Sequence, residues 1–362
     1  MNTLPHRADI DAYDTQAKEL LAAAQSNDRD AAWRFKWEHP RFRGKPVTEV
    51  KTEDLDQDDA RLVIARSYAF ETWTDLEAFT RSIHTDLDIA RFESAVEAVV
   101  AGDTNALTQT LRDHPGIVHA RSTRRHHATL LHYIAANGVE GSRQRTPPNA
   151  VAIATLLLEA GADPNALADM YDAQCTTMSM LVSSAPPAQA GLQTALAELL
   201  VDYGAKLDGA GSRWQSAILT ALAFGYQDTA RSLARRDPPP DNLAIMAGLG
   251  RLNDVIRLLP HADSKTKHVA LALAAQHGHT DVVRVLLDAN EDPNRYNPEG
   301  FHAHSTPLHQ AVWSNHRDVV RLLVERGAAL DFRDSVYEGT PLDWAIYGNR
   351  TEIADYLRQL NP

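Results

Sequence analysis

The sequence predicts an all-α protein in which helix–turn–helix units stack into an elongated solenoid behind an N-terminal helical segment. The main observation is internal repetition, because Thr-Pro-Leu at 306–308 recurs at 340–342 within the same pattern of apolar and polar residues. The same plan without Thr-Pro occurs at 268–294 and, interrupted by an insertion, at 129–166. A single helix pair of this kind cannot cover its own apolar face, so neighbouring units are expected to stack.

Each unit is predicted to start with a short helix at a Thr-Pro pair such as Thr306-Pro307. Threonine is a favoured N-cap residue, and proline loses nothing at the first helical position, where an N–H would have no helical partner. A polar turn such as Gly278-His279 leads to a second helix, whose apolar face in the clearest unit lies within 319–323. Glycines expected to end the second helices in a left-handed conformation stand at 161, 204 and 327.

Five stretches approach one consensus: LLHYIAANG (130–138), LLLEAGADPNA (156–166), AAQHGHTDVVRVLLDANEDPN (274–294), TPLH (306–309) and LLVERGAAL (322–330). These stretches resemble ankyrin repeats. The resemblance implies an ankyrin-repeat solenoid with β-turn fingers, which binds other macromolecules through its fingers and inner helices. It also implies that the Thr and His side chains of the motif connect neighbouring units by hydrogen bonds. The motif residues are His132, Thr306, Pro307, His309, Thr340 and Pro341.

We expect two regions, an N-terminal helical cap segment over residues 1–87 and an ankyrin repeat array over 88–362. The array holds about seven units, some of them degenerate. Residues 28–40 align without a gap with residues 103–115 and share the closing His-Pro, so they are predicted to belong to a capping helix pair. Residues 58–83 carry an IAR-Y-F-W-L pattern and resemble a segment that often precedes ankyrin arrays in bacterial proteins. Their aromatic residues are interpreted as core, with a partner-binding cluster as the alternative.

Composition and charge restrict the class of function. The net charge of −12 at pH 7 opposes non-specific binding to nucleic acid and to anionic membranes. The single cysteine, Cys175, excludes an intramolecular disulfide and a cysteine-based zinc site. The N-terminus lacks the apolar stretch of a signal peptide, and no apolar run is long enough to span a bilayer. We therefore expect a cytoplasmic protein.

One candidate binding element is the finger at 295–305, which is longer than the family consensus. It contains Phe301, His302 and His304, and His316 follows closely in sequence. If His-Ala-His lies on an extended strand, both imidazoles face the same side. Two histidines fall short of the ligands that Zn²⁺ requires, so they form only a weak metal candidate. Contact with a partner and a solvated loop are the alternatives.

Two further groups are candidates for contact with a partner. The first is basic and consists of Arg121, Arg124, Arg125, His126 and His127, with Arg143 and Arg145 added by the insertion at 139–149. Arginine forks suit carboxylates and phosphates, so this group suggests a partner with an acidic surface. The alternative is a solvated finger balanced by neighbouring acids. The second group is aromatic and lies near the ends of inner helices; its members are Trp313, Tyr347, Phe224 and Tyr226.

Catalytic signatures such as G-x-S-x-G, a P-loop or H-E-x-x-H do not occur in the sequence. We therefore expect a scaffold or adaptor that binds a protein partner through its fingers and concave face, with no cofactor implied. The alternative from another class is an enzyme, or a binder of a metal or small ligand, with a pocket built from the enlarged loops 295–305 and 139–149. Phosphate binding to RNA or lipid at 121–145 is a third hypothesis, which predicts strong salt dependence.

Overall fold

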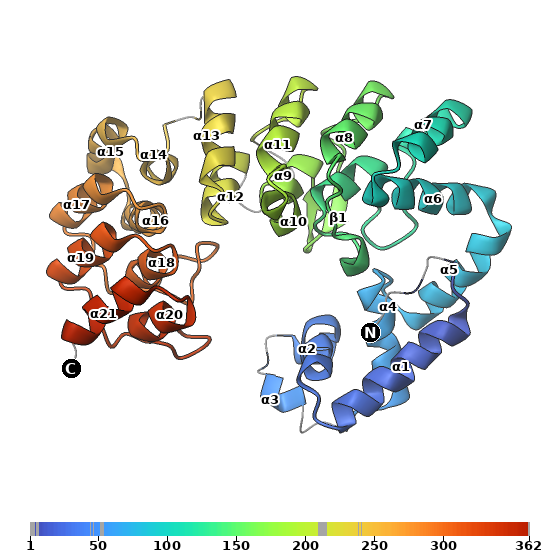
Figure 1. Cartoon of the computed structure of the whole chain (residues 1–362), viewed down its shortest axis with the longest axis horizontal. Helices are drawn as coiled ribbons and strands as arrows, with labels where there is room; N and C mark the ends of the chain where they lie inside the picture. Colours follow the sequence, from blue (N-terminus) through green and yellow to red (C-terminus); the bar gives the residue numbers. More distant parts are fainter. Residues whose placement is uncertain are drawn as a thin grey trace. The chain divides into compact units, whose positions relative to one another are not determined.

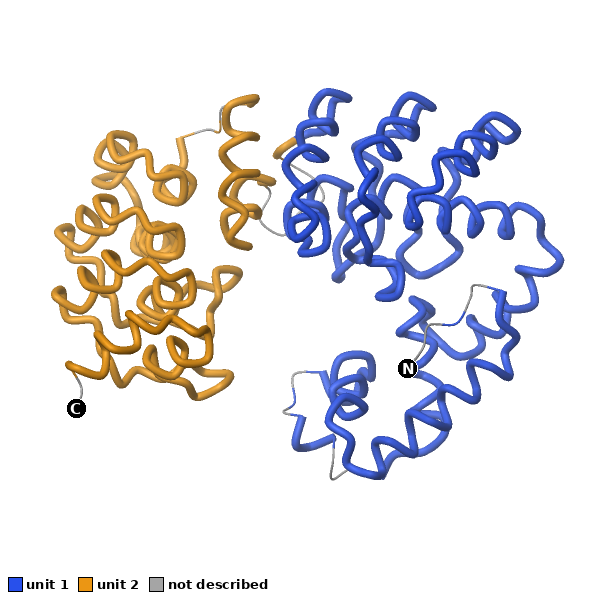
Figure 2. The backbone as a smooth tube through the Cα atoms, in the orientation of Figure 1, with its two compact units in different colours: residues 1–206, 210–213 blue, residues 207–209, 214–362 orange. Residues whose placement is uncertain are grey.

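The computed structural model describes residues 4, 7–43, 45, 47–50, 54–208, 216–237, 239 and 241–360. The remaining residues, which include parts of both predicted regions, lie outside this description. The chain divides into two compact units, unit 1 with residues 1–206 and 210–213, and unit 2 with residues 207–209 and 214–362 (Figure 2). Unit 1 therefore contains both the predicted cap segment and the first predicted repeats.

Unit 1 begins with helices that form a core of their own. They are α1 (Ile10–Gln25), α2 (Arg29–Glu38), η1 (Pro40–Phe42), α3 (Val47–Val50), α4 (Gln57–Ser67) and α5 (Trp73–Thr85). Phe35, Ile64, Leu76 and Phe79 are among the buried side chains of this core. Ala69 adopts a left-handed φ of 63° in the turn between α4 and α5. Most of the large apolar residues of 58–83 are thus core residues.

The repeats of unit 1 follow this helical segment. Their elements are α6 (Leu87–Ala101), α7 (Thr104–Asp113), η2 (Pro115–His119), η3 (Leu130–Ala135), η4 (Gly141–Arg143), α8 (Ala150–Glu159), β1 (Ala168–Met170), β2 (Ala173–Cys175), α9 (Thr177–Leu181), α10 (Ala185–Gln189) and α11 (Gln193–Asp202). The outer helices α7, α8 and α11 stand side by side (Figure 1). The inner row consists of α6, η3 and α9. Strands β1 and β2 pair antiparallel and form one finger.

Unit 2 contains the more regular repeats. Its elements are α12 (Ala217–Ala223), α13 (Gln227–Arg236), α14 (Leu243–Leu249), α15 (Leu252–Leu258), η5 (Leu259–His261), α16 (Ser264–Gln276), α17 (Thr280–Asp288), α18 (Pro307–Trp313), α19 (Arg317–Glu325), α20 (Pro341–Tyr347) and α21 (Thr351–Leu360). The inner helices α12, α14, α16, α18 and α20 stack in this order, and α15, α17 and α19 form the outer row (Figure 1). Val319, Val320 and Leu323 face the shared core, as the period of the sequence predicts. No described helix is long and apolar enough to cross a membrane.

The predicted helix ends agree with the structure. Thr306 and Thr340 are N-caps, and Pro307 and Pro341 are the first residues of α18 and α20. The three glycines expected to end outer helices have left-handed φ values of 96°, 87° and 86°; they are Gly161, Gly204 and Gly327. These agreements follow from local chemistry, because a cap or a left-handed residue needs no distant partner.

The motif histidines join neighbouring repeats. His309 Nδ1 accepts a hydrogen bond from Thr306 Oγ1 at 2.8 Å, and its Nε2 donates to the Gly339 carbonyl of the next repeat at 3.2 Å. His132 in unit 1 does the same, donating to the Cys175 carbonyl at 3.2 Å. Burial lowers the pKa of His132 to about 4, so the ring is neutral at pH 7.

Asp343 replaces the motif histidine in the last repeat. Its carboxylate accepts hydrogen bonds from the Thr340 N–H at 2.9 Å and the Thr340 hydroxyl at 2.8 Å. These bonds hold the pKa of Asp343 below its usual range. A carboxylate has no proton to donate across a repeat boundary, so this position caps α20 without the link that histidine provides.

A second series of contacts runs through the turns between paired helices. His316 Nε2 donates to the Gln276 carbonyl at 3.0 Å, and its ring lies over Gly278. A Cβ added at Gly278, where φ is 76°, would lie 2.5 Å from His316 Nδ1. Asn315 takes the left-handed turn position in the following repeat, and there Arg350 instead of a histidine reaches across the boundary. The turn residue is therefore small where a histidine ring packs against it, as at Gly278, and larger where Arg350 crosses the boundary, as at Asn315.

Candidate partner-binding surface

The long finger, residues 295–305, is a compact loop and not the extended strand that the sequence suggests. The Asn297 N–H donates to the Ser305 carbonyl at 2.8 Å, which closes the loop. Inside it, the Ser305 N–H donates to the His302 carbonyl at 3.0 Å, and His302 has a left-handed φ of 62°. The prediction that His302 and His304 alternate along a strand is therefore wrong. A turn runs between the two residues, and their rings meet edge to face.

His302 anchors the long finger on the inner helices. Its Nε2 donates to the Ala223 carbonyl at the end of α12 at 2.9 Å. Burial lowers the pKa of His302, so the ring is neutral at pH 7. Phe301 beside it is buried, with 7% of its surface exposed. These two predicted partner-binding residues therefore hold the finger in place instead of presenting themselves to a partner.

His304 joins four aromatic residues, and we call His304, Trp313, Tyr337, Trp344 and Tyr347 the aromatic face. The ring centroids of His304 and Trp344 are 5.8 Å apart, and those of Trp344 and Trp313 are 6.0 Å apart. Trp313 and Tyr347 stack at 6.3 Å, while His304 and Tyr337 meet edge to face at 6.3 Å. Exposure is 82% for Tyr347, 74% for Tyr337 and 44% for Trp313. The aromatic face is thus continuous and open to solvent.

A buried carboxylate shapes the finger that presents Tyr337. Asp334, which is 1% exposed, accepts hydrogen bonds from the Trp344 indole at 2.9 Å and from the Tyr337 N–H at 2.6 Å. The oxygen that accepts from Trp344, Oδ2, also accepts from the Gly339 N–H at 2.9 Å. These donors hold the pKa of Asp334 below its usual range although burial acts in the opposite direction. Asp334 therefore remains ionised and fixes the Trp344 ring.

Direct contacts connect the long finger to the finger that carries Tyr337. The Ser335 N–H donates to the His304 carbonyl at 2.9 Å. The Tyr296 hydroxyl donates to the Arg333 carbonyl at 2.8 Å, and the Tyr296 ring packs edge to face on Phe332. Since Trp313 and Tyr347 are the last residues of α18 and α20, the aromatic face is held by two helices and two joined fingers.

The basic group of unit 1 is not exposed as a whole, because Arg124 and Arg143 are buried. Arg124 Nη2 lies 2.9 Å from Glu93 Oε2, and Arg143 Nη2 lies 2.7 Å from the same oxygen. Glu140 contacts both arginines, at 3.0 Å from Arg143. We call Glu93, Arg124, Glu140 and Arg143 the buried charge cluster; each is at most 5% exposed. Its side chains cannot meet a partner at the surface.

Aromatic rings and a histidine complete the environment of the buried charge cluster. The Arg124 guanidinium lies 4.8 Å from the Phe70 ring and 4.5 Å from the Phe79 ring. His126 is 2% exposed, with Nε2 3.4 Å from Glu140 Oε2. The cluster therefore joins the N-terminal helices to the repeats of unit 1. Arg124 and His126, predicted to contact a partner, act inside the protein because neighbouring glutamates and rings enclose them.

The other members of the basic group are exposed but bonded within the chain. Arg121 donates to the His127 carbonyl at 2.9 Å, and His127 Nδ1 pairs with Asp169 Oδ2 at 2.9 Å. Arg125 lies 3.7 Å from a Glu71 carboxylate oxygen. An acidic partner therefore has fewer basic side chains to contact, since two of the five residues, Arg124 and His126, lie in the interior.

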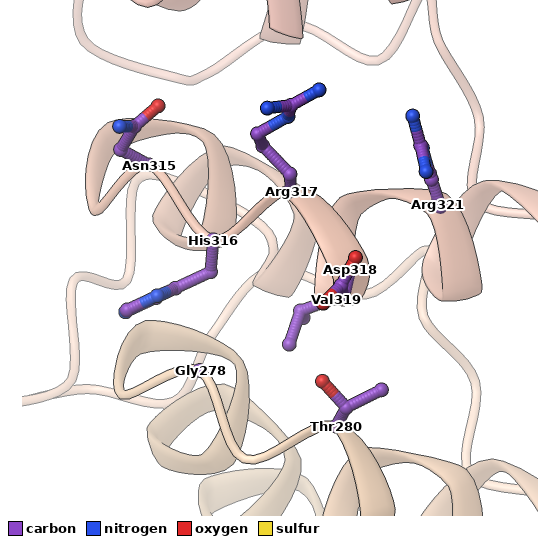
Figure 3. Close-up of a pocket in the computed structure, with 8 residues that line it drawn as sticks. All are labelled: Gly278, Thr280, Asn315, His316, Arg317, Asp318, Val319 and Arg321. Carbon is purple, nitrogen blue, oxygen red and sulfur yellow. The ribbon is translucent and has the colours of Figure 1, made fainter.

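A shallow polar depression of about 510 Å³ surrounds His316 (Figure 3). His316 extends along Gly278, while Arg317 and Arg321 point away from Thr280. A second depression of about 390 Å³ is lined by Leu330, Asp331, Arg333, Thr340, Leu342 and Leu357. Neither depression is lined by His302 or His304.

Among the residues that the structure describes, no group of three His, Cys, Asp or Glu side chains is arranged to hold a metal. His302 and His304 have rings 6.1 Å apart, and His302 Nε2 is bonded to a backbone carbonyl. The pair thus lacks both a third ligand and a free Nε2 on one ring. An enzyme or metal-binding pocket at the enlarged loops gains no support from this geometry.

Sequence patterns indicated only part of the aromatic face. Trp313, Tyr347 and His304 were candidates, whereas Tyr337 and Trp344 were not. Tyr337 stands three residues before Thr340, which places it on the finger of that repeat and was an available signal. Trp344 lies in the first turn of α20, where sequence alone suggests a core residue.

Comparison with known proteins agrees with the geometry of unit 2. A family model for ankyrin repeats in three copies matches residues 242–334 and 297–361. An ankyrin repeat-containing protein of Schizosaccharomyces pombe is 40% identical over 90 residues, which span 25% of this chain and 40% of that protein. Ankyrin repeat and SOCS box protein 6 of Mus musculus is 34% identical over 132 residues, 36% of this chain and 29% of that protein.

A third relative, ankyrin repeat and SAM domain-containing protein 6 of Mus musculus, is 33% identical over 106 residues, 29% of this chain and 12% of that protein. The chain spans less than half the length of each of these relatives. The C-terminal repeats are therefore ankyrin repeats, and the fold is an all-α ankyrin repeat fold. These three relatives come from yeast and mouse, so the bacterial character of the N-terminal segment stays a prediction.

Proposed function

We propose that this ankyrin repeat protein is an adaptor that docks a partner protein on the aromatic face of unit 2. The observation that supports the proposal is the chain of five contacting rings, three of them well exposed. Trp and Tyr dominate the binding energy of protein interfaces because they bury a large area with few rotatable bonds. An exposed cluster of such rings on a folded chain marks an interaction surface.

Rigidity favours the same role. Trp344 is tied to Asp334, and the two fingers are hydrogen-bonded to each other. Ordering these groups in the free protein removes an entropic cost from the binding step. In this proposal His302 and Phe301 position the surface, and His304, Trp313 and Tyr347 contact the partner.

An acidic partner at the basic finger is the weaker form of the proposal. Arg121, Arg125 and His127 remain exposed, but each already has an acceptor in the chain. Such exposed ion pairs contribute about 0–1 kcal/mol each. We therefore assign the main binding role to the aromatic face, and not to this finger.

The test is affinity capture from an extract of the source cell with the double variant Trp313→Ala/Tyr347→Ala. A matched control, Trp37→Ala/Tyr171→Ala, removes two rings that are 73% and 68% exposed on unit 1. We expect the proteins captured by the wild type to be lost with the first variant and retained with the control. Equal recovery with both variants, each verified as folded by circular dichroism, would contradict the proposal.

A further inference from the structure

Some aromatic rings elsewhere in the chain are covered by cations of the chain itself. Lys36 Nζ lies 5.3 Å from the centroid of the exposed Trp37 ring, and the Arg321 guanidinium lies 5.7 Å from the Tyr356 ring. Within the described part of the chain, no cation lies in this way over a ring of the aromatic face. The negative faces of these rings are therefore available to a cation from outside.

The acidic residues of the stretch 331–350, which carries Tyr337, Trp344 and Tyr347, favour a cationic partner as well. Asp331 and Glu338 are exposed, and among the described residues their carboxylates have no hydrogen-bond or ion-pair partner. Asp343 is exposed as well, and its hydrogen bonds with Thr340 leave it ionised. The two arginines of this stretch, Arg333 and Arg350, donate to backbone carbonyls of the chain. Asp331 and Glu338 thus carry negative charges with no partner among the described residues, whereas Arg333 and Arg350 keep their positive charges while they donate to carbonyls of the chain.

The net charge of the chain reinforces this complementarity. At −12 it raises the rate of encounter with a cationic partner and opposes an anionic one. An Arg or Lys side chain can lay its apolar stem on a ring and keep its charged end near a carboxylate. Arginine suits the position best, because its planar guanidinium both stacks on aromatic rings and bonds carboxylates in pairs.

We infer that the segment of the partner that contacts the aromatic face is basic and carries arginine or lysine side chains. This inference rests on the proposed function and adds the chemical class of the partner. One cation stacks on the exposed rings of Trp313 and Tyr347, and a second reaches Glu338 beside Tyr337. The aromatic face therefore selects basic segments by cation–π contact and by charge attraction together.

The test measures fluorescence anisotropy with the full chain and a labelled peptide in which arginine alternates with serine. Two matched peptides carry citrulline, which has the same shape without the charge, or glutamate in place of arginine. We expect the arginine peptide to bind, the citrulline peptide to bind about tenfold more weakly and the glutamate peptide not to bind. Equal binding of the arginine and citrulline peptides, or binding of none of the three, overturns the inference.

Two variants separate contact with the rings from general attraction to an acidic chain. Trp313→Ala leaves the net charge unchanged, and we expect it to weaken the arginine peptide about tenfold. Trp37→Ala removes a ring that Lys36 already covers, and we expect no change. Unaltered affinity of Trp313→Ala means that the peptide binds elsewhere and contradicts the inference.

The carboxylates are tested with the double variant Asp331→Asn/Glu338→Gln, which should weaken arginine-peptide binding severalfold and reduce its salt dependence. Full retention of affinity by this variant would count against a basic partner. If captured proteins depend on Trp313 and Tyr347 while the arginine peptide does not bind, the proposed function stands and the basic class fails.

Discussion

The buried charge cluster of unit 1 and the aromatic face of unit 2 look alike as sequence features and differ completely as structures. Both contain residue types that are typical of binding sites. In unit 1, glutamates from α6 and from the insertion reach Arg124 and Arg143 and remove them from solvent. In unit 2, Trp313 and Tyr347 find each other but stay exposed.

Burial accounts for the different roles of the arginines of unit 1 and the aromatic residues of unit 2. A buried arginine must be paired, because an isolated charge in the interior costs several kcal/mol. Once paired, it acts only on the structure around it. Exposed rings lose their contact with water only when something else covers them, so they retain a driving force for binding. The arginines of the buried charge cluster are thus enclosed in unit 1, whereas the rings of the aromatic face remain exposed on unit 2.

The largest expected effect is the loss of one member of the buried charge cluster. Glu93→Gln removes a charge that faces both Arg124 and Arg143, at 2.9 Å and 2.7 Å. Because two buried guanidinium groups lose one of the two carboxylates that they share and keep only Glu140 as a shared partner, we expect the free energy of unfolding of unit 1 to fall by about 3 kcal/mol. Urea unfolding followed by circular dichroism measures it.

The matched control is Glu97→Gln, since Glu97 pairs with Arg143 at 2.7 Å but its side chain is 41% exposed. We expect a loss of about 1 kcal/mol or less there. A similar loss in both variants would break the comparison, because the cluster would then behave like a surface ion pair.

The second test asks whether a substitution between neighbouring repeats of unit 2 destabilises the protein as much as one in the buried charge cluster of unit 1. Gly278→Ala forces a side chain into a left-handed position 2.5 Å from His316 Nδ1, so we expect about 2–3 kcal/mol of destabilisation. Gly327→Ala meets the same φ restriction with open space around it and should cost about 1 kcal/mol. Thermal unfolding compares the two, and equal losses would mean that the His316 ring moves aside freely.

The third test concerns pH. The pKa of His132 is about 4 in the folded protein, below the ordinary value of 6.5, so the unfolded chain binds the extra proton first. The contribution of His132 to stability is therefore complete well above pH 6.5 and falls as the pH drops through 6.5 toward 4. At pH 5 the loss from this residue is about 2 kcal/mol. Urea unfolding between pH 7 and 4.5 measures the slope, and a flat profile would contradict the burial of a neutral ring.

The smallest effect is expected at the aromatic face itself. Tyr347→Ala removes a ring that is 82% exposed, so the free energy of unfolding should change by about 0.5 kcal/mol or less. The same urea unfolding experiment serves as the measurement. A loss above about 1 kcal/mol would show that the ring stabilises the repeats, and it would remove the contrast between the two regions.

Much of the fold could be predicted because its signals are local. Thr306-Pro307 and Thr340-Pro341 start helices wherever they occur, and Gly161 or Gly327 ends one through its own backbone freedom. The candidate site was predictable only in part. Trp313 and Tyr347 were recognised by their place near the ends of inner helices, which the repeat period specifies. Their contact with Trp344 and the exposed Tyr337 depends on how the fingers fold.

Sequence by itself determined the repeats, their helix boundaries and the acidic balance of the chain, because period, capping and charge act over a few residues or add up along the chain. Tertiary structure alone decided which unusual residues are buried. Arg124 meets Glu93 across 31 positions of sequence, and His302 meets Ala223 across 79. Such contacts form only when separate repeats stack, so burial and exposure, and with them the choice between a structural and a binding role, are properties of the packed molecule.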